Sequence, residues 1–146
     1  MKNKIIIVSG DPNSINSEII HKCWKNINKS LQKKIFLISN VNLLKKQFKK
    51  LNIKIKLNPI QNIKQFKGEG LKVIDVKVNF KDPFNVSKKS SSYFVINSLN
   101  LAHTLALDKS VKGIINCAIN KTLLNKKNLG VTEYLASKCG IKDGSE

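Results

Sequence analysis

The residues of this chain whose types and spacing best suit chemistry lie in one stretch, residues 113–133. It opens with Ile114 and Ile115, a short β-type run, and then breaks into small and polar residues that include Asn120 and Lys121. A strand that ends in small residues, an amide and a lysine lets a ligand approach the backbone, because nothing bulky blocks the crevice at the carboxyl edge of a sheet. A plain loop that ends a strand has a similar composition, so this pattern alone leaves both interpretations open.

The cysteines and histidines form no recognisable ligand pattern. Cys23, Cys117 and Cys139 are odd in number and far apart, without a C-x-x-C pair. His21 and His103 are isolated, whereas a metal site needs a cluster of ligands. We therefore expect reduced thiols, no disulfide framework and no metal site in this chain.

The positive charge is the feature that most favours a nucleic-acid partner. The formal net charge is +18 and the pI is about 10.0, as in proteins that neutralise phosphates. All 27 basic residues are lysine, however, although arginine is the side chain best shaped for bidentate phosphate and guanine recognition. An A/T-rich coding bias is the simpler explanation, with lysines on solvated faces. A nucleic-acid-binding domain is the least favoured alternative.

Length and patterning predict one soluble unit. A chain of 146 residues is long enough for one domain, or for part of a larger one, and too short for two complete domains. It has no apolar run near the length of a membrane span, and its first residues show no signal-peptide pattern. These features predict a cytoplasmic protein without a membrane partner.

Apolar runs and helical spacing alternate along the chain, which predicts an α/β fold. Strands are predicted at residues 4–8, 34–39, 53–57 and 71–80 and at the start of the stretch 113–133. Helices are predicted at 15–28, from Asn40 as N-cap to 51, from 90 to 107 and at 132–139, with 58–70 as a connection. We expect a mostly parallel sheet with helices on both faces, in which strand 4–8 is central and covered on both faces.

The carboxyl end of the chain has the pattern of an interrupted fold. Gly140 is suited to end the last helix, and residues 141–146 have the composition of a loop that precedes another strand. The sequence therefore predicts that the fold continues beyond this point.

Two motifs together resemble one known family. SGDPNSINSEI (residues 9–19) resembles the first-strand loop of the 4-hydroxythreonine-4-phosphate dehydrogenase family, which has the pattern Gly-Asp/Glu-Pro-Ala-Gly-Ile-Gly-Pro-Glu/Asp. NCAINKTLLNKKNLGVTEYLA (residues 116–136) resembles its Thr-Gly-Pro-Ile-Asn-Lys segment and the following Gly-His-Thr-Glu. The order and spacing of the motifs agree as well, so the resemblance spans essentially the whole chain.

The resemblance implies a dimeric, two-domain α/β enzyme with its active site in the cleft between the domains. In such an enzyme three histidines hold a divalent metal (zinc, magnesium or cobalt), and NAD accepts a hydride from a phosphorylated small-molecule substrate. Residues 1–129 would form most of the first domain, and residues 130–146 would begin a truncated second one. The family's three metal-binding histidines lie beyond the end of this chain, and neither His21 nor His103 matches one of them.

The matching positions supply the candidate site residues. From the first loop, the cleft residues implied by the resemblance are Gly10, Asp11, Pro12 and Glu18. From the second stretch, the implied substrate-binding residues are Thr132, Lys121 and Asn120. No residue of the chain is assigned as catalytic or as a metal ligand.

The chain also departs from the family pattern. Val131 replaces the histidine before Thr132, which removes a hydrogen-bonding group that a polar substrate would use. Cys117-Ala118 replaces Gly-Pro in the second loop. In the first loop four residues replace Ala, Gly, Gly and Pro, which brings its tight glycine geometry into question; these are Asn13, Ser14, Asn16 and Ser17.

The resulting hypothesis is an amino-terminal portion of a 4-hydroxythreonine-4-phosphate dehydrogenase-like protein. The implied reaction is NAD-dependent oxidation of 4-phosphooxy-threonine, with decarboxylation, in pyridoxal phosphate biosynthesis. The portion is expected to be inactive alone. The alternative from another class is a non-catalytic ligand-binding or interaction domain of the same fold.

Overall fold

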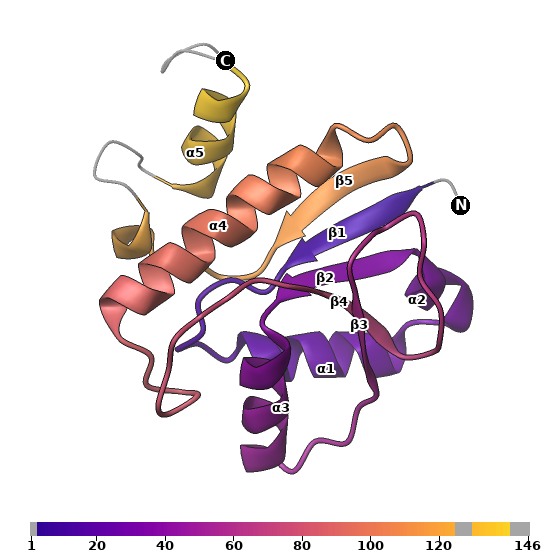
Figure 1. The fold of residues 1–146 in the computed structure, drawn as a ribbon, viewed down its shortest axis with the longest axis horizontal. Helices are drawn as coiled ribbons and strands as arrows, with labels where there is room; N and C mark the ends of the chain where they lie inside the picture. Colours follow the sequence, from indigo (N-terminus) through magenta and orange to yellow (C-terminus); the bar gives the residue numbers. More distant parts are fainter. Residues whose placement is uncertain (1–2, 125–129, 141–146) are drawn as a thin grey trace.

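The structure, a computed structural model, is built around a sheet of five parallel strands. It describes residues 3–124 and 130–140. The strands are Lys4–Val8 (β1), Ile35–Ser39 (β2), Leu57–Ile60 (β3), Leu71–Asp75 (β4) and Val111–Asn116 (β5). Their order across the sheet is β3-β4-β2-β1-β5 (Figure 1). The predicted α/β class with a parallel sheet is thus confirmed.

Helices lie on both faces of this sheet. They are Asn16–Asn26 (α1), Lys29–Lys34 (α2), Val41–Lys50 (α3), Lys88–Ala106 (α4) and Val131–Lys138 (α5), with a 3-10 turn at Lys121–Leu123 (η1). In Figure 1, α4 runs along one side of the sheet with α5 beside it, and α1 and α3 lie on the other side. None of the helices in the described residues is long and apolar enough to span a membrane.

Several boundaries differ from the sequence prediction, most of them by one or two residues. The helix predicted at 15–28 ends at Asn26, and a second helix follows because the Asn28 side chain accepts a hydrogen bond from the Leu31 amide and caps it. The predicted strand 71–80 ends at Asp75, whose carboxylate turns to cap α3 by accepting from the Val41 amide at 2.8 Å.

The predicted strand 53–57 is wrong except for Leu57, because β3 lies further along the chain in the segment predicted as a connection. β3 contains Pro59, which cannot donate a ladder hydrogen bond. The strand accommodates this proline because it is at the edge of the sheet and pairs only with β4 among the described strands. The alternating Ile-Lys pattern therefore does not mark the strand here.

One face of the sheet is fully buried under α4. Ile6 and Val8 of β1 and Phe36 of β2 have no exposed surface, and they pack with Phe94 and Leu99 of the helix. Each such side chain contributes about 2 kcal/mol through burial. This face fixes α4, and with it the loops that leave the carboxyl ends of β1 and β5.

The opposite face is covered only in part. α1 and α3 pack Ile20 and Phe48 over β2 and β4. Beside them, Ile5 and Ile7 of β1 are only half-buried, and Ile115 of β5 is 54% exposed. The prediction that β1 is covered on both faces is therefore right for the α4 face and incomplete for the other.

Candidate functional site

The strand order places one crevice at the carboxyl ends of β1 and β5. The chain passes from β1 to β2 on one side of β1, and β5 is added on its other side. The two strands pair in parallel, with Val8 opposite Asn116, so the loops that follow them leave the same edge of the sheet. In open α/β sheets, ligands bind where the strand order reverses in this way. Both motifs singled out in the sequence meet at this point.

Gly10 brings the two loops into direct contact. Its φ is +75°, and a Cβ atom at this position would lie 2.5 Å from the carbonyl oxygen of Ala118. The next amide, that of Asp11, donates to the same Ala118 oxygen at 3.0 Å, and the Cys117 amide donates to Val8 at 2.9 Å. Glycine is therefore required here both for the positive φ and for the close approach.

Asn16 joins the same two loops from below. Its side-chain amide donates to the carbonyl oxygens of Ser9 at 3.0 Å and Ala118 at 2.7 Å, and the residue is 2% exposed. A glycine, which the family pattern has near this position, could not make these bonds. The departure from the glycine pattern thus leaves the loops tied together by a side chain.

Two further amides fix the outer part of the first loop. Asn13 donates to the Val86 carbonyl at 2.8 Å and accepts from the Val86 amide at 2.7 Å. Gln47 of α3 donates to the carbonyl oxygens of Pro12 and Pro83 at 2.9 and 2.8 Å. The sequence patterns did not indicate either residue as a positioning residue. For Gln47, the feature that could have done so is a polar amide among the apolar positions of a helix.

A small polar cavity lies beneath the first loop. Its volume is about 10 Å³, enough for about one water molecule. Four buried side-chain oxygens of residues that line it have no hydrogen-bond partner among the described residues; they belong to Ser9, Asn16, Ser17 and Ser39. The floor of the crevice is therefore closed and polar, and a ligand can reach only the loops above it.

Asn120 and Lys121 lie in the loop that follows β5, and both are exposed. Asn120 accepts hydrogen bonds from the amide and the hydroxyl of Thr122, both at 3.0 Å, and so caps η1. Ser92 of α4 donates to the carbonyl oxygen of Leu123 at 2.6 Å and holds this turn against the helix. After Lys121 the structure shows only this single helical turn among the described residues, and residues 125–129 lie outside them.

Thr132 and Val131 begin α5. Thr132 is exposed, and α5 is fixed to α4 through Tyr134, whose hydroxyl donates to the Asn100 side chain at 2.6 Å. Tyr134 is 3% exposed and belongs to the same apolar cluster as α4 and β1. The predicted domain boundary between residues 129 and 130 stays a prediction.

The first-loop residues do not all share one place. Gly10, Asp11 and Pro12 line the crevice floor, but Glu18 lies in the first turn of α1 and pairs with Lys22 at 2.9 Å. The hydrogen bond from Lys22 lowers the pKa of Glu18, which keeps this carboxylate charged. The structure thus brings three of the four predicted residues together and places the fourth on the helix surface.

Cys117, at the end of β5, is half-buried. Burial raises its pKa to about 11, so the thiol stays protonated at neutral pH. A protonated thiol is a poor nucleophile. This side chain therefore contributes packing and not covalent chemistry.

The described residues do not fit a metal site. Within residues 3–124 and 130–140, no three side chains of His, Cys, Asp or Glu are grouped so that they could hold an ion. His103 lies 3.7 Å from the sulfur of Cys139, far along α4 from the crevice, and His21 packs near Phe48. We therefore derive no chemical step through a metal from these residues.

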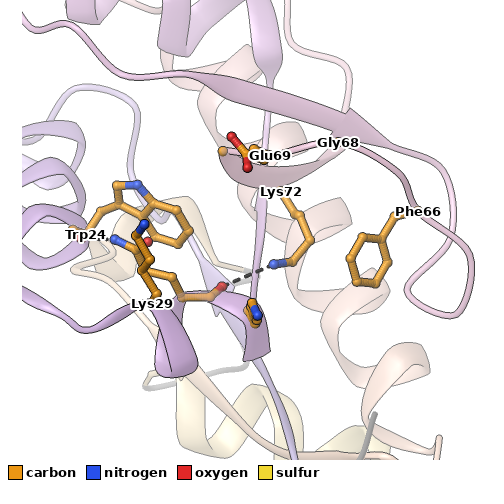
Figure 2. A pocket seen from close by; sticks show the side chains of 9 residues that line it. Trp24, Lys29, Phe66, Gly68, Glu69 and Lys72 are labelled. Carbon is orange, nitrogen blue, oxygen red and sulfur yellow. Dashed lines mark hydrogen bonds between the residues drawn. The ribbon is translucent and has the colours of Figure 1, made fainter.

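A second hollow lies at the opposite end of the sheet, beside the amino ends of β2 and β4 (Figure 2). It measures about 430 Å³, and its walls include Trp24, Lys29, Phe66 and Lys72. Lys72 is 4% exposed; its ammonium group donates to the Gln32 carbonyl at 3.1 Å and lies 5.2 Å from the centre of the Phe66 ring. Burial lowers the pKa of Lys72. This hollow is distant from both sequence motifs.

Fold and crevice together define a class, that of open, parallel α/β proteins which bind a ligand at the carboxyl edge of the sheet. The particular family follows from comparison: the family model described as Pyridoxal phosphate biosynthetic protein PdxA matches residues 30–145. The chain belongs to this family.

Curated relatives agree with this assignment. The chain is 30% identical to a 4-hydroxythreonine-4-phosphate dehydrogenase from Aquifex aeolicus over 146 residues, which is 98% of this chain and 45% of the relative. It is 27% identical to the enzyme of that name from Wigglesworthia glossinidia brevipalpis, with 92% and 41% covered. The chain thus spans less than half the length of these relatives.

Solved structures show the same fold. A 4-hydroxythreonine-4-phosphate dehydrogenase from Burkholderia phymatum aligns with a TM-score of 0.81 at 21% identity, covering 98% of this chain and 45% of that one. The enzyme of that name from Klebsiella pneumoniae aligns with a TM-score of 0.78 at 22% identity, covering 97% and 46%. At these identities the likeness shows the fold alone.

Proposed function

We propose that this chain forms one wall of the active site of a cytoplasmic 4-hydroxythreonine-4-phosphate dehydrogenase. The observation that supports this best is the direct contact between the two motif loops, with the Asp11 amide bonded to the Ala118 carbonyl at the reversal of strand order. Family membership supports a phosphorylated small molecule as the substrate class, and the rest of the active site would come from the portion of the family that this chain does not match.

The proposed reaction is the oxidation of the secondary alcohol of 4-phosphooxy-threonine. Oxidation of this alcohol would remove a hydride and the hydroxyl proton, and the resulting 3-oxo acid would lose carbon dioxide. NAD supplies the hydride chemistry when it is bound. The described residues do not provide a group of ligands for the metal that the family implies. We therefore assign its ligands to the portion of the family that this chain does not match.

The role proposed for this chain's own residues is to bind and orient the substrate. Lys121 is exposed at the start of η1, where its ammonium group can attract the substrate phosphate, and Asn120 holds that turn in place. Thr132, exposed at the start of α5, offers a hydroxyl from the next element. The Val131 side chain has no hydrogen-bonding group. A substrate group that the family's histidine would bind would therefore form its hydrogen bond with water.

A chimera tests this proposal. Joining the unmatched portion of the Aquifex aeolicus relative to this chain should give NADH formation from 4-phosphooxy-threonine with zinc, magnesium or cobalt present. The 146-residue chain alone should give none at any concentration of these metals, because residues 3–124 and 130–140 hold no group of side chains that could bind the metal, and the chain supplies one wall only. Metal-dependent NADH formation by the lone chain would contradict the proposal, and a folded but inactive chimera would favour the non-catalytic binding domain.

Lys121→Ala separates a substrate-binding role from a structural one. In the chimera it should lower kcat/KM at least about tenfold, as expected for loss of a charged hydrogen bond. The melting temperature should change by no more than about 2 °C, because the side chain is exposed. The matched control is Lys109→Ala, an exposed lysine at the other end of β5, which should change neither value. Equal losses of activity and stability would assign Lys121 to the scaffold.

A further inference from the structure

The hollow beside the amino ends of β2 and β4 combines aromatic walls with an excess of positive charge. The charged residues that line it are three lysines and one glutamate: Lys29, Lys33, Lys72 and Glu69. Its aromatic walls are Trp24 of α1 and Phe66 of the segment between β3 and β4, and Figure 2 shows the Lys72 side chain between them. Pockets of several hundred Å³ that combine apolar walls with a few charged groups are typical binding sites for small molecules. The volume of about 430 Å³ lies in this range.

Lys72 is the buried charge of this hollow. It is 4% exposed, and within the described residues its ammonium group donates one hydrogen bond, to the Gln32 carbonyl. The rings of Phe36 and Phe66 have their centres 4.8 and 5.2 Å from the ammonium nitrogen, and they attract the charge without offering an acceptor oxygen. An ammonium group has three N–H donors, and its burial is costly unless they are paired. An anion in the hollow would provide the acceptor that this buried charge needs.

Hydrogen bonds and ring contacts hold both walls of the hollow in place. Gln32 of α2 donates from its side-chain amide to the Trp24 carbonyl at 2.8 Å, and its own carbonyl accepts from Lys72. In the other wall, the Phe66 ring packs edge to face against Phe36, with the ring centres 5.3 Å apart. The walls are therefore fixed before a ligand binds, which lowers the entropy cost of binding.

Charge and shape together select the class of ligand. Lys29 and Lys33 line the same hollow and are exposed, so they attract an anion toward Lys72. Glu69 carries the opposing charge, but the three positive charges outweigh it. The two aromatic walls favour a flat ring, since aromatic rings stack on one another and bury a large apolar area. A bare inorganic anion would leave these walls without a partner.

We propose that this hollow is a second binding site, which takes a small organic anion with a flat ring. The carboxylate or phosphate of the ligand would accept hydrogen bonds from Lys72, and its ring would pack between Trp24 and Phe66. The site lies at the amino edge of the sheet, whereas the crevice lies at the carboxyl edge. This inference rests on the walls and the charge of the hollow, and it does not depend on the reaction proposed above.

Trp24 fluorescence tests the site directly, because Trp24 is the only tryptophan of the chain and lines the hollow. The 146-residue chain is titrated with adenosine monophosphate and with benzoate, two anions that carry a flat ring. Adenosine and inorganic phosphate, titrated separately, provide the ring or the charge alone. Ionic strength is kept constant, so that general attraction to a net charge of +18 is screened equally. At least one ring anion should change the fluorescence saturably, and adenosine and phosphate should bind at least about tenfold more weakly. A response to adenosine monophosphate alone would identify the bound group as a phosphate, and a response to benzoate alone would identify it as a carboxylate.

Matched variants locate the binding. Lys72→Met should weaken binding of the responding anion at least about tenfold, because it removes the buried charged donor. Lys29→Ala should weaken binding as well, and this exposed lysine provides the test if the melting temperature shows that the buried substitution disturbs folding. Glu69→Gln should tighten binding, since it removes the negative charge that opposes the anion. Lys45→Ala is the control: Lys45 is an exposed lysine of α3 outside the hollow, and its replacement should leave the affinity unchanged.

Several results would overturn the proposal. The absence of a saturable fluorescence change with both ring anions would show that the hollow does not bind this class of ligand. Adenosine or inorganic phosphate that binds as tightly as the responding ring anion would show that ring and charge are not both needed. Equal affinities of the lysine variants of the hollow, of Lys45→Ala and of the unmodified chain would place the ligand elsewhere. Trp24 also lines an apolar groove between β1, β5 and α1, and the described residues that line this groove include no lysine, so a ligand bound there would give this last result.

Discussion

At the scale of single residues, the crevice depends on one glycine and one asparagine that act together. Gly10 allows the first loop to pass against the Ala118 carbonyl, and Asn16 donates to that same oxygen. Among the first-loop residues 9–18, Gly10 alone has a positive φ. The first loop therefore needs glycine at one position only. Where the family pattern has a further glycine, this chain has Asn16, whose side-chain amide holds the first and second loops together.

Gly10→Ala should destabilise the protein by about 2 kcal/mol. The new Cβ would meet backbone at 2.5 Å and would require a non-glycine residue at positive φ. Urea denaturation followed by circular dichroism measures this difference. Gly113→Ala is the control, because a Cβ at that position in β5 would have no atom of the described residues within 4 Å, and it should be neutral or slightly stabilising. Equal stability of the two variants would mean that the loops are not in close contact.

Lys72 shows the effect of burial on a charge. Its pKa is lowered by burial, so the folded state favours the neutral amine more than the unfolded state does. The unfolded state then binds more protons between the lowered pKa and the ordinary value of 10.5, and stability rises with pH across that window. Below the window the lysine is charged in both states, and its burial opposes folding.

Lys72→Met should therefore raise the free energy of unfolding at neutral pH. It should also remove the rise in stability that the unmodified protein shows as pH increases toward 10.5. Denaturant titrations at several pH values measure both effects. Lys29→Met, an exposed lysine of the same hollow, should change neither the stability nor its pH dependence. Loss of stability in Lys72→Met would show that the hydrogen bond to Gln32 and the ring contacts outweigh the cost of burial.

At the scale of elements, the turn between α4 and β5 aligns the start of the edge strand. The carboxylate of Asp108 accepts from the amide and the hydroxyl of Ser110 at 2.8 and 2.7 Å and pairs with Lys64 at 3.0 Å. Ser110 in turn accepts from the Lys4 ammonium at 2.7 Å, which joins the turn to β1. The Ser110 hydrogen bonds, followed by Lys64, hold the pKa of Asp108 well below its ordinary value.

Asp108 should make the stability depend on pH in the acid range. Above the ordinary value of 3.8 the carboxylate is charged in both states and its stabilisation is complete. As pH falls below 3.8 the unfolded state takes up the proton first, so the free energy of unfolding falls. Asp108→Asn should be less stable at pH 7 and should lose less stability on acidification, as measured by urea titrations at each pH.

Glu69→Gln is the control for this pH dependence. Glu69 is an exposed carboxylate in the loop before β4, so its replacement should leave the acid loss of stability intact. An acid profile that is the same in Asp108→Asn and the unmodified protein would place the proton-linked stability elsewhere.

The elements themselves were largely predictable where one pattern dominated. Apolar β-branched runs located β1 and β2, and Asn40 is the N-cap of α3, accepting from the Leu43 amide at 2.9 Å, as its position before an apolar helix predicted. β3 was misplaced because Pro59 argues against a strand at this position. A strand with this proline is possible here because β3 lies at the edge of the sheet. α2 was missed because its six residues are too few to show helical periodicity.

The candidate site was less predictable than the fold. The motifs identified the loops that meet, but not the amides of Asn13, Asn16 and Gln47 that hold them, since each bonds to backbone distant in the sequence. Glu18 matched the motif by position and lies outside the crevice, because one helical turn directs it toward Lys22. The spacing of the motifs in the sequence therefore located the two loops. Only the folded structure showed that Glu18 lies on the surface of a helix and not in the loop.

At the scale of the whole molecule, the chain is a parallel α/β unit with one face complete and the other open. The complete face is covered by α4. The open face includes Ile115 of β5, the strand whose following loop forms one side of the crevice. The crevice and the open face thus share β5, the strand that leads into the loop with Asn120 and Lys121.

The strand order also bears on how the sheet is assembled as the chain is synthesised. β1 pairs with β2 across about thirty residues, but its pairing with β5 joins Ile5 to Gly113 across more than a hundred. Bringing such distant segments together costs more chain entropy, and long-range parallel pairing forms slowly. We expect β1, β2 and β4 to form a nucleus while the ribosome is still adding α4. The crevice, which needs β5, would then be the last part of the sheet to appear.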